Sequence, residues 1–131
     1  MKFTWMAFAL AVMLVSGVEA YAHHSFAASY DENGTIEIEG ELVQFFFRNP
    51  HSWVHVIAPN ENGELVRYGV EWGGAGQLTG GGVTRFTLRP GDHVIISGSP
   101  GRNPADHIIR MESIRRTSDD FAWGFEGEYF D

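Results

Sequence analysis

Cysteine is absent from all 131 residues of this sequence. Without a thiol, the chain cannot form a disulfide, a thiolate zinc site or an iron–sulfur cluster, and it cannot use a cysteine nucleophile. Its chemistry must therefore come from histidine, carboxylate, aromatic or backbone groups.

Basic residues are also scarce, since nine Lys and Arg stand against 17 Asp and Glu, for a net charge of −8 at pH 7. A protein that tracks nucleic-acid phosphates needs a basic stripe, so this balance argues against nucleic-acid binding and favours neutral, cationic or metallic partners. Hydrophobic residues make up 44% of the chain, which predicts a folded protein, and the length predicts a single domain.

The N-terminus has the pattern of a signal peptide. Lys2 precedes an apolar run over residues 3–15 that is short for a membrane span, and small residues then form two cleavage patterns, ending at Ala20 and Ala22. We expect residues 1–22 to be removed after Ala22, with cleavage after Ala20 as the alternative. An uncleaved anchor is the competing interpretation. Cleavage predicts a bacterial protein that is periplasmic or secreted, with no stable membrane anchor.

Most of the remaining chain shows the period-2 alternation of β-strands. The first predicted strand, residues 35–47, alternates Ile and Glu up to Gly40, after which its apolar phase shifts at Val43. That shift predicts a bulge or bend, which lets one long strand serve two sides of a small barrel. Further strands are expected over residues 52–58, 65–72, 94–96 and 107–116, with a short edge strand over residues 84–88.

Segments rich in turn residues separate these strands. Residues 73–82 hold six glycines and predict a loop with at most one helical turn, and residues 97–105 are predicted as loop. A single helical segment between the third and fourth main strands is the order of an OB-type barrel. The predicted fold class is therefore all-β, a small OB-like barrel of five to six strands with at most one short helix. We assign residues 1–22 to the signal peptide, 23–116 to the barrel and 117–131 to a tail.

The tail over residues 117–131 contains five acidic residues and no basic one. Its alternating aromatic residues Phe121, Trp123 and Phe125 suit addition to a sheet edge, and we consider them candidate contacts to a periplasmic partner protein. The alternative is a tail that docks on its own barrel.

Four motifs, in order along the chain, resemble a bacterial family of small exported proteins known as the domain of unknown function numbered 6152. The motifs are His23-His24-Ser25-Phe26, Asn49-Pro50-His51-Ser52-Trp53, Glu71-Trp72-Gly73-Gly74 and Leu88-Arg89-Pro90-Gly91-Asp92-His93-Val94. The resemblance implies an exported β-domain and supplies neither an activity nor catalytic residues. The chain departs from the family pattern in the glycine-rich segment after Gly74 and in its acidic tail.

The strongest chemical feature is the predicted mature N-terminus. After cleavage at Ala22, His23 offers an α-amine and an imidazole to one metal ion, and His24 adds a second imidazole. Both kinds of nitrogen lose their proton near neutral pH, and a nitrogen-rich site of this kind favours Cu(II) or Ni(II). Cleavage after Ala20 would place a His third in the chain, which also suits Cu(II). The competing interpretation is a flexible polar terminus.

His51, His55 and Glu71 are further candidate metal ligands. On a strand, His51 and His55 start about 13 Å apart at ~3.3 Å per residue, so they share a metal only if the chain curls at Pro50 or if one joins His23. His51 is the better ligand because it lies in the barrel's first loop, whereas His55 suits a packed side chain. Glu71 precedes the glycine loop, where its carboxylate can support a metal site or simply face outward.

The sequence contains no nucleophile elbow, paired-carboxylate spacing or dinucleotide fingerprint, so an enzymatic function is without support. The hypothesis is an exported barrel that binds copper as a carrier, buffer or accessory protein. The alternative is a metal-free interaction module that uses a barrel edge or the tail. A third hypothesis, copper-dependent oxidation at the N-terminal His, requires a second His within reach.

Overall fold

The computed structural model describes residues 26–125, which form a closed β-barrel of five strands with one additional short strand. The elements, in chain order, are β1 (Ile36–Phe46), β2 (Trp53–Pro59), β3 (Leu65–Glu71), α2 (Ala75–Gly80), β4 (His93–Pro100), a 3₁₀ helix (Pro104–Asp106), β5 (Ile108–Arg116) and β6 (Ala122–Trp123). Residues 26–29 form a further helical turn. Within this described range, no helix is both long and apolar enough to cross a membrane.

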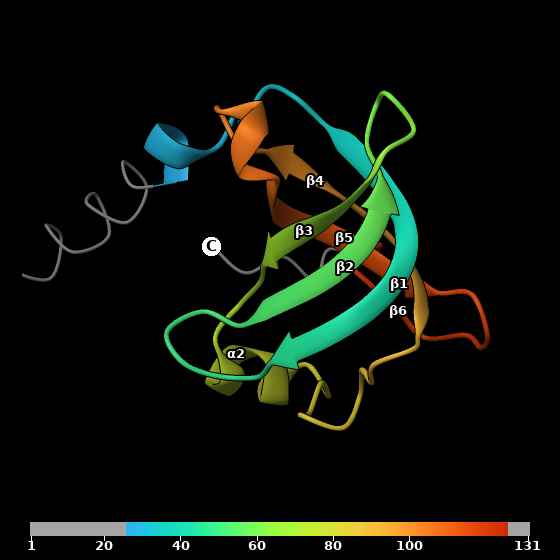
Figure 1. The fold of residues 1–131 in the computed structure, drawn as a ribbon. Coiled ribbons are helices and arrows are strands. Elements are labelled where there is room, and N and C mark those ends of the chain that lie inside the picture. The colour runs from blue at the N-terminus through green and yellow to red at the C-terminus, as the bar shows by residue number, and fades with distance from the viewer. Residues whose placement is uncertain (1–25, 126–131) are drawn as a thin grey trace, which may run out of the picture.

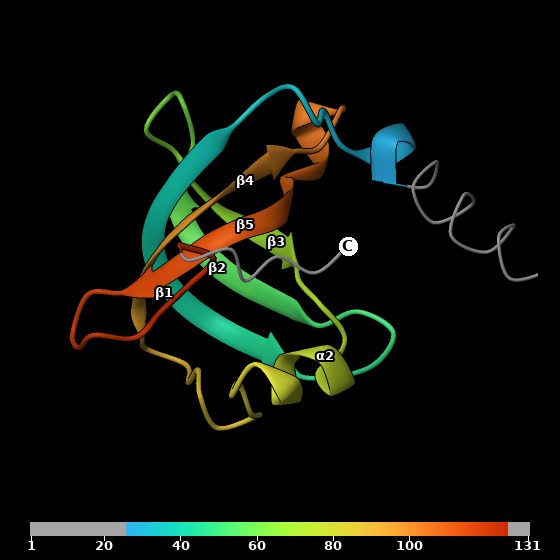
Figure 2. The same ribbon diagram turned by 180° about the vertical axis from the view of Figure 1, so that it is seen from behind.

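The strands follow the order β3-β2-β1-β4-β5-β6, and β3 also pairs with β5 to close the barrel. Every pairing is antiparallel except this closing one, which is parallel and aligns Glu71 with Arg110. β1, β2 and β3 form the near wall in Figure 1, and β4 and β5 form the wall seen from behind in Figure 2. Together with α2 between β3 and β4, this order confirms the predicted OB-like barrel.

The long first strand serves both walls, as its shift of phase predicts. Its first half pairs with β4 and its second half with β2, and the register shifts between Leu42 and Gln44. Gly40 lies where β1 passes from one partner to the other, and a Cβ atom there would overlap the carbonyl oxygen of Ile57. Glycine is therefore required at this position because the backbones of two strands approach too closely for a side chain.

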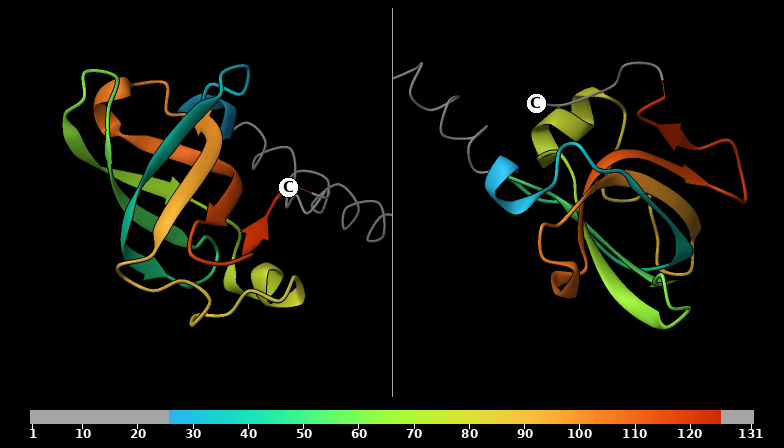
Figure 3. Two further views of the ribbon diagram at one scale, coloured as in Figure 1. Left: turned by 90° about the vertical axis from the view of Figure 1, so that its right-hand side faces the viewer. Right: turned by 90° about the horizontal axis from the view of Figure 1, so that it is seen from above.

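The core fills the barrel with side chains from every strand and from the segment between α2 and β4. Seen from above, the strands encircle this single interior (Figure 3). Leu78 of α2, Val83 and Leu88 are buried at the end of the barrel that α2 covers, whereas the 3₁₀ helix lies at the other end. The fully buried side chains include Leu42, Leu78, Val54, Val56, Val70, Val94, Ile96, Ile109 and Ile114.

Two local predictions are wrong. Residues 84–88 form a turn and not an edge strand. The backbone N–H of Thr87 donates to the carbonyl oxygen of Thr84, and the backbone N–H of Thr84 donates to Oγ1 of Thr87. The predicted loop over residues 97–105 begins too early, because β4 continues to Pro100. Pairing with β5 overrides the turn-forming residues here, and Gly98 is needed because a Cβ atom would overlap the carbonyl oxygen of Arg110.

Candidate functional site

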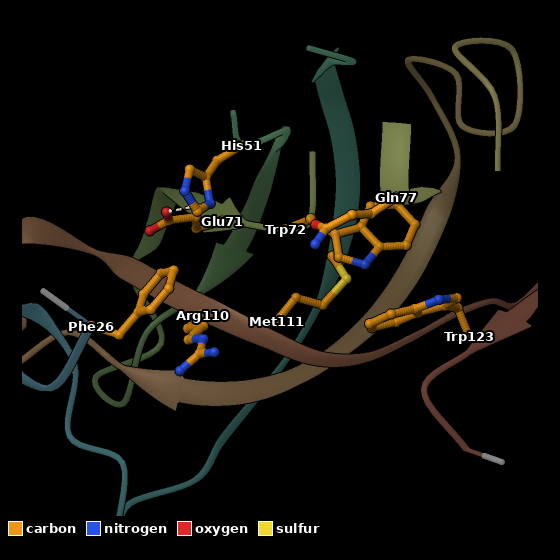
Figure 4. A pocket seen from close by; sticks show the side chains of 9 residues that line it. Phe26, His51, Glu71, Trp72, Gln77, Arg110, Met111 and Trp123 are labelled. Atoms are coloured by element: carbon orange, nitrogen blue, oxygen red, sulfur yellow. Dashed lines mark ion pairs between the residues drawn. The ribbon is translucent and has the colours of Figure 1, made fainter. Parts of the chain in front are cut away.

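A small cavity lies beside the edge where β3 and β5 pair (Figure 4). It is lined by aromatic rings, a His–Glu pair and a few flexible side chains, from Phe26, His51, Glu71, Trp72, Gly73, Gln77, Arg110, Met111 and Trp123. Its volume of about 40 Å³ suits water molecules or a metal ion better than an organic ligand of drug size.

His51 and Glu71 form the polar end of this cavity. The Nδ1 atom of His51 lies 3.1 Å from Oε1 of Glu71, and the two side chains are 40% and 14% exposed. The hydroxyl of Tyr30 donates a hydrogen bond to the other carboxylate oxygen, Oε2 of Glu71. Burial, and then the Glu71 carboxylate, raise the pKa of Tyr30, so the phenol keeps the proton that it donates.

The His51 loop is held against the segment that follows β3. The buried Ser52 exchanges backbone hydrogen bonds with this segment, from Ser52 N to Gly73 O at 3.0 Å and from Trp72 N to Ser52 O at 2.8 Å. Gly74 lies so close to the carbonyl oxygen of Pro50 that any side chain would collide with it. Two of the four motifs that carry the family resemblance, residues 49–53 and 71–74, therefore pack directly on each other.

Phe26, the last residue of the first motif, lies at the same place. Its ring meets the imidazole of His51 edge to face, with the ring centres 5.5 Å apart. The Phe26 ring also contacts Arg110, whose guanidinium lies 4.0 Å from the ring centre. Arg110 forms a second contact, an ion pair with Glu32 at 3.3 Å. These two contacts hold the chain segment that precedes β1 against β5, beside His51.

The segment around Tyr30 is fixed by backbone hydrogen bonds as well. Asp31 N donates to Pro100 O at 2.9 Å, and Arg102 N donates to Ser29 O at 2.9 Å. These bonds join residues 29–31 to the chain between β4 and the 3₁₀ helix, and Figures 1 and 2 show the helical turn at residues 26–29 and the 3₁₀ helix at the same end of the molecule. The end of β4 and the loop that follows it thus hold Tyr30 within hydrogen-bonding distance of Glu71.

Trp72 supplies the apolar end of the cavity. Its indole packs edge to face on Trp123, with ring centres 5.1 Å apart, and it is tilted against Phe45 at 6.1 Å. The indole Nε1 of Trp72 is buried and has no hydrogen-bond partner among the residues that the structure describes.

His55 lies apart from this cluster, on the outer face of β2. Its Nδ1 accepts a hydrogen bond from Nε of Arg67 at 2.9 Å, and its ring meets that of Phe46. Burial, and then the Arg67 and Arg48 charges, lower the pKa of His55. The structure therefore joins His51 to Glu71 and leaves His55 in a different environment, as a packed histidine.

The predicted ligands His23 and His24 lie outside the described residues. Their place in the chain is nevertheless informative, because His24 precedes Phe26 by only two residues. Among residues 26–125, no group of three or more His, Cys, Asp or Glu side chains is arranged to hold a metal ion.

The three tail residues have different surroundings. Trp123 is only 4% exposed and belongs to the core through β6, which pairs with Ile114 and Arg115 of β5. Phe121 packs partly against the core, with the Arg116 guanidinium 5.2 Å from its ring centre. Phe125 is 60% exposed. The described part of the tail, residues 117–125, thus docks on its own barrel through Trp123, the alternative that the sequence left open.

Sequence reasoning missed Tyr30, Arg110 and the role of Phe26. Phe26 was visible only as part of the first motif. Tyr30 lies 41 residues from Glu71 in the chain, and Arg110 reaches the site through the parallel pairing that closes the barrel. No local pattern reports contacts of this range.

A protein-family model described as "Family of unknown function (DUF6152)" matches residues 11–110, a range that contains His51, Glu71 and Arg110. This match confirms the resemblance carried by the four motifs. No curated protein matches the sequence.

Proposed function

The chain belongs to this family of unknown function, and we propose that it is an exported β-barrel protein that binds copper through His51 and the histidines that precede Phe26. It would act as a carrier, buffer or accessory protein. One observation carries the proposal: the His51 imidazole is held by Glu71 on one side and contacts Phe26 on another.

The His51–Glu71 pair has the arrangement of a metal-binding histidine and its supporting carboxylate. An ionised carboxylate accepts hydrogen bonds only, so the proton of the neutral imidazole belongs on Nδ1 and the lone pair on Nε2. Histidines that bind metals usually make this hydrogen bond, which orients the ring and raises its basicity. Tyr30 supports the pair further by donating to the second oxygen of Glu71.

Chain length allows the N-terminal histidines to reach His51. Consecutive Cα atoms are about 3.8 Å apart, so the Cα of His24 lies within about 8 Å of that of Phe26, and the Cα of His23 within about 11 Å. Phe26 is itself packed on the His51 ring. A terminus cut after Ala22 would then offer its α-amine and two imidazoles beside His51.

Such a donor set favours copper. Amine and imidazole nitrogens suit Cu(II), which also leads the affinity order of the divalent first-row metals. In the proposal, His23 supplies its amine and imidazole, and His24 or His51 supplies a further nitrogen, with Glu71 as the outer support of His51. His55 is left out of this set because its Nδ1 accepts the hydrogen bond of Arg67, so the proton of the neutral ring lies on Nε2 and no lone pair is free for a metal.

The first test is native mass spectrometry of the protein exported by its own signal peptide and recovered without chelators. We expect a chain that begins at His23, or at Tyr21, with one copper ion bound. A correctly cut chain that stays metal-free after Cu(II) is added would refute the copper proposal.

The second test measures Cu(II) affinity by competition with a chelator. His23→Ala should abolish tight binding, and His51→Ala should weaken it at least about tenfold, the effect of losing one ligand interaction of about 1.4 kcal/mol. His93→Ala is the matched control, because His93 also pairs with a carboxylate, Glu39 at 3.0 Å, but on the exposed outer face. Equal affinities for His51→Ala and the parent protein would exclude His51 from the site.

The alternative of a partner-binding tail is supported by the exposed side chain of Phe125. Trp123 is needed in the core, so removal of residues 117–131 would also damage the barrel. A cleaner test replaces Phe125 with Ser and compares the proteins captured from a periplasmic extract. Loss of a captured protein would favour this function, and an unchanged set would exclude the Phe125 surface.

A further inference from the structure

A second and larger hollow lies at the end of the barrel that carries the 3₁₀ helix. It is bounded by the β2–β3 hairpin loop at residues 60–62 and by the β4–β5 connection at residues 100–108, and its volume is about 430 Å³. That volume falls within the range of about 300–1,000 Å³ that is typical of small-molecule sites. We call it the hairpin groove. It shares no lining residue with the cavity at His51.

Tyr68 provides a polar group deep in the hairpin groove. The residue is only 5% exposed, yet its hydroxyl makes no hydrogen bond to any residue in the described part of the chain. Burial, and then the charge of Glu61, raise the pKa of Tyr68, so the hydroxyl stays protonated and can both donate and accept. A hydroxyl placed in this way has hydrogen-bonding capacity to offer a ligand.

His107 adds an aromatic face with a fixed position. Its ring meets that of Tyr68 edge to face, with centres 5.6 Å apart. The backbone of His107 is left-handed, with φ 48°, which is uncommon for a residue other than glycine. Gly69 N holds it there by donating to His107 O at 2.9 Å. Between residues 26 and 125, the imidazole nitrogens of His107 have no hydrogen-bond partner.

The rim of the hairpin groove mixes donors and acceptors. Nε of Arg102 donates to Ala27 O at 2.6 Å, which anchors the guanidinium and leaves its terminal amino groups available. Glu61 and Asp31 contribute carboxylates, and Asn62 contributes a side-chain amide. The two carboxylates outnumber the single guanidinium of Arg102 and disfavour an anion. A ligand with hydroxyl groups satisfies both kinds of rim residue because each hydroxyl donates and accepts.

We propose that the hairpin groove binds a neutral sugar, a mono- or disaccharide, whose hydroxyls are recognised by Tyr68, Arg102 and the rim carboxylates. The partly exposed ring of His107 provides the apolar contact that a sugar ring needs, while Tyr68, whose ring belongs to the core, contributes its hydroxyl. Barrels of this type bind oligosaccharides with the face of their second and third strands and with their β1–β2 and β4–β5 loops, and the hairpin groove shares the β4–β5 connection with that site. The proposal is independent of metal binding at His51.

The test is nuclear magnetic resonance of the ¹⁵N-labelled mature protein with cellobiose and N-acetylglucosamine, each raised to tens of millimolar. We expect the amide signals of Asn62, Gly101 and His107 to shift in a saturable way. Tyr68→Phe keeps the ring and the fold, and it should weaken sugar binding about tenfold by removing one buried hydrogen bond. His93→Ala, which removes a ring from the exposed outer face and away from the groove lining, is the control and should leave sugar binding unchanged.

Three outcomes would overturn the proposal. The first is the absence of groove shifts with both sugars. The second is binding that Tyr68→Phe and Asn62→Ala leave unchanged. The third is tighter groove binding of the charged comparison compounds glucuronate or glucosamine, which would assign the groove to an ionic ligand.

Discussion

His51 Nδ1 lies 3.1 Å from Oε1 of Glu71, and this contact connects the loop after β1 to the last residue of β3. Tyr30 approaches Glu71 from the segment before β1. The orientation of the His51 ring is therefore defined by the folded barrel and does not depend on a bound ligand. A preorganised imidazole of this kind costs little entropy when a metal binds.

Replacing Glu71 by Gln tests whether this contact supports metal binding. Gln keeps the size of the side chain but removes the charge that strengthens the imidazole as a ligand. We expect Cu(II) affinity to fall about tenfold to a hundredfold, the usual effect of losing such a support. Chelator competition measures it. Glu39→Gln removes the equivalent partner of His93 on the outer face and should have no effect; equal losses in both variants would argue against a site at His51.

Because the backbones of β1 and β2 approach closely at Gly40, we expect a side chain at this position to destabilise the protein. A Cβ atom there would overlap the carbonyl oxygen of Ile57, so Gly40→Ala must separate β1 from β2. We expect a loss of about 1–3 kcal/mol or more in the free energy of unfolding, measured with urea. Gly76→Ala, on the open surface of α2, is the control and should be neutral or stabilising by up to about 1 kcal/mol. A neutral Gly40→Ala variant would contradict the described crossing of the strands.

Burial of Trp123 predicts that β6 is part of the stable barrel. Trp123→Ala should reduce the free energy of unfolding by about 3–5 kcal/mol, as for other large aromatic residues removed from a core. Phe125→Ala, two residues further on and largely exposed, should change it by less than about 0.5 kcal/mol. Thermal or urea unfolding distinguishes the two. Similar small effects would mean that the tail is not docked.

We expect His55 to contribute to the pH dependence of the free energy of unfolding. Because its pKa is lowered in the folded protein, the unfolded chain binds this proton first as the pH falls, near about pH 6.5. The contribution is thus complete above that pH and is lost as the pH falls toward the folded pKa. His55→Gln should flatten the decline in unfolding free energy between about pH 7 and about pH 5. An unchanged decline would show that other groups cause it.

Much of the barrel could be predicted from local sequence pattern. Alternation of apolar and polar residues located the strands, and the shift of phase at Val43 located the bulge between Leu42 and Gln44. The pattern failed at residues 84–88 and 97–100. At residues 84–88 hydrogen bonds between Thr84 and Thr87 close a local turn, and at residues 97–100 the non-local pairing of β4 with β5 decided the conformation.

The candidate site was predictable in its residue types but not in its arrangement. His51 and Glu71 stood out as polar groups next to turns, and the sequence alone determined that no thiolate can take part in a metal site of this chain. Only the tertiary structure decided that these two meet, that Tyr30 and Phe26 complete the cluster, and that His55 stays outside. The physical reason is that β-strand periodicity is local, whereas the parallel pairing of β3 with β5 joins segments far apart in the chain.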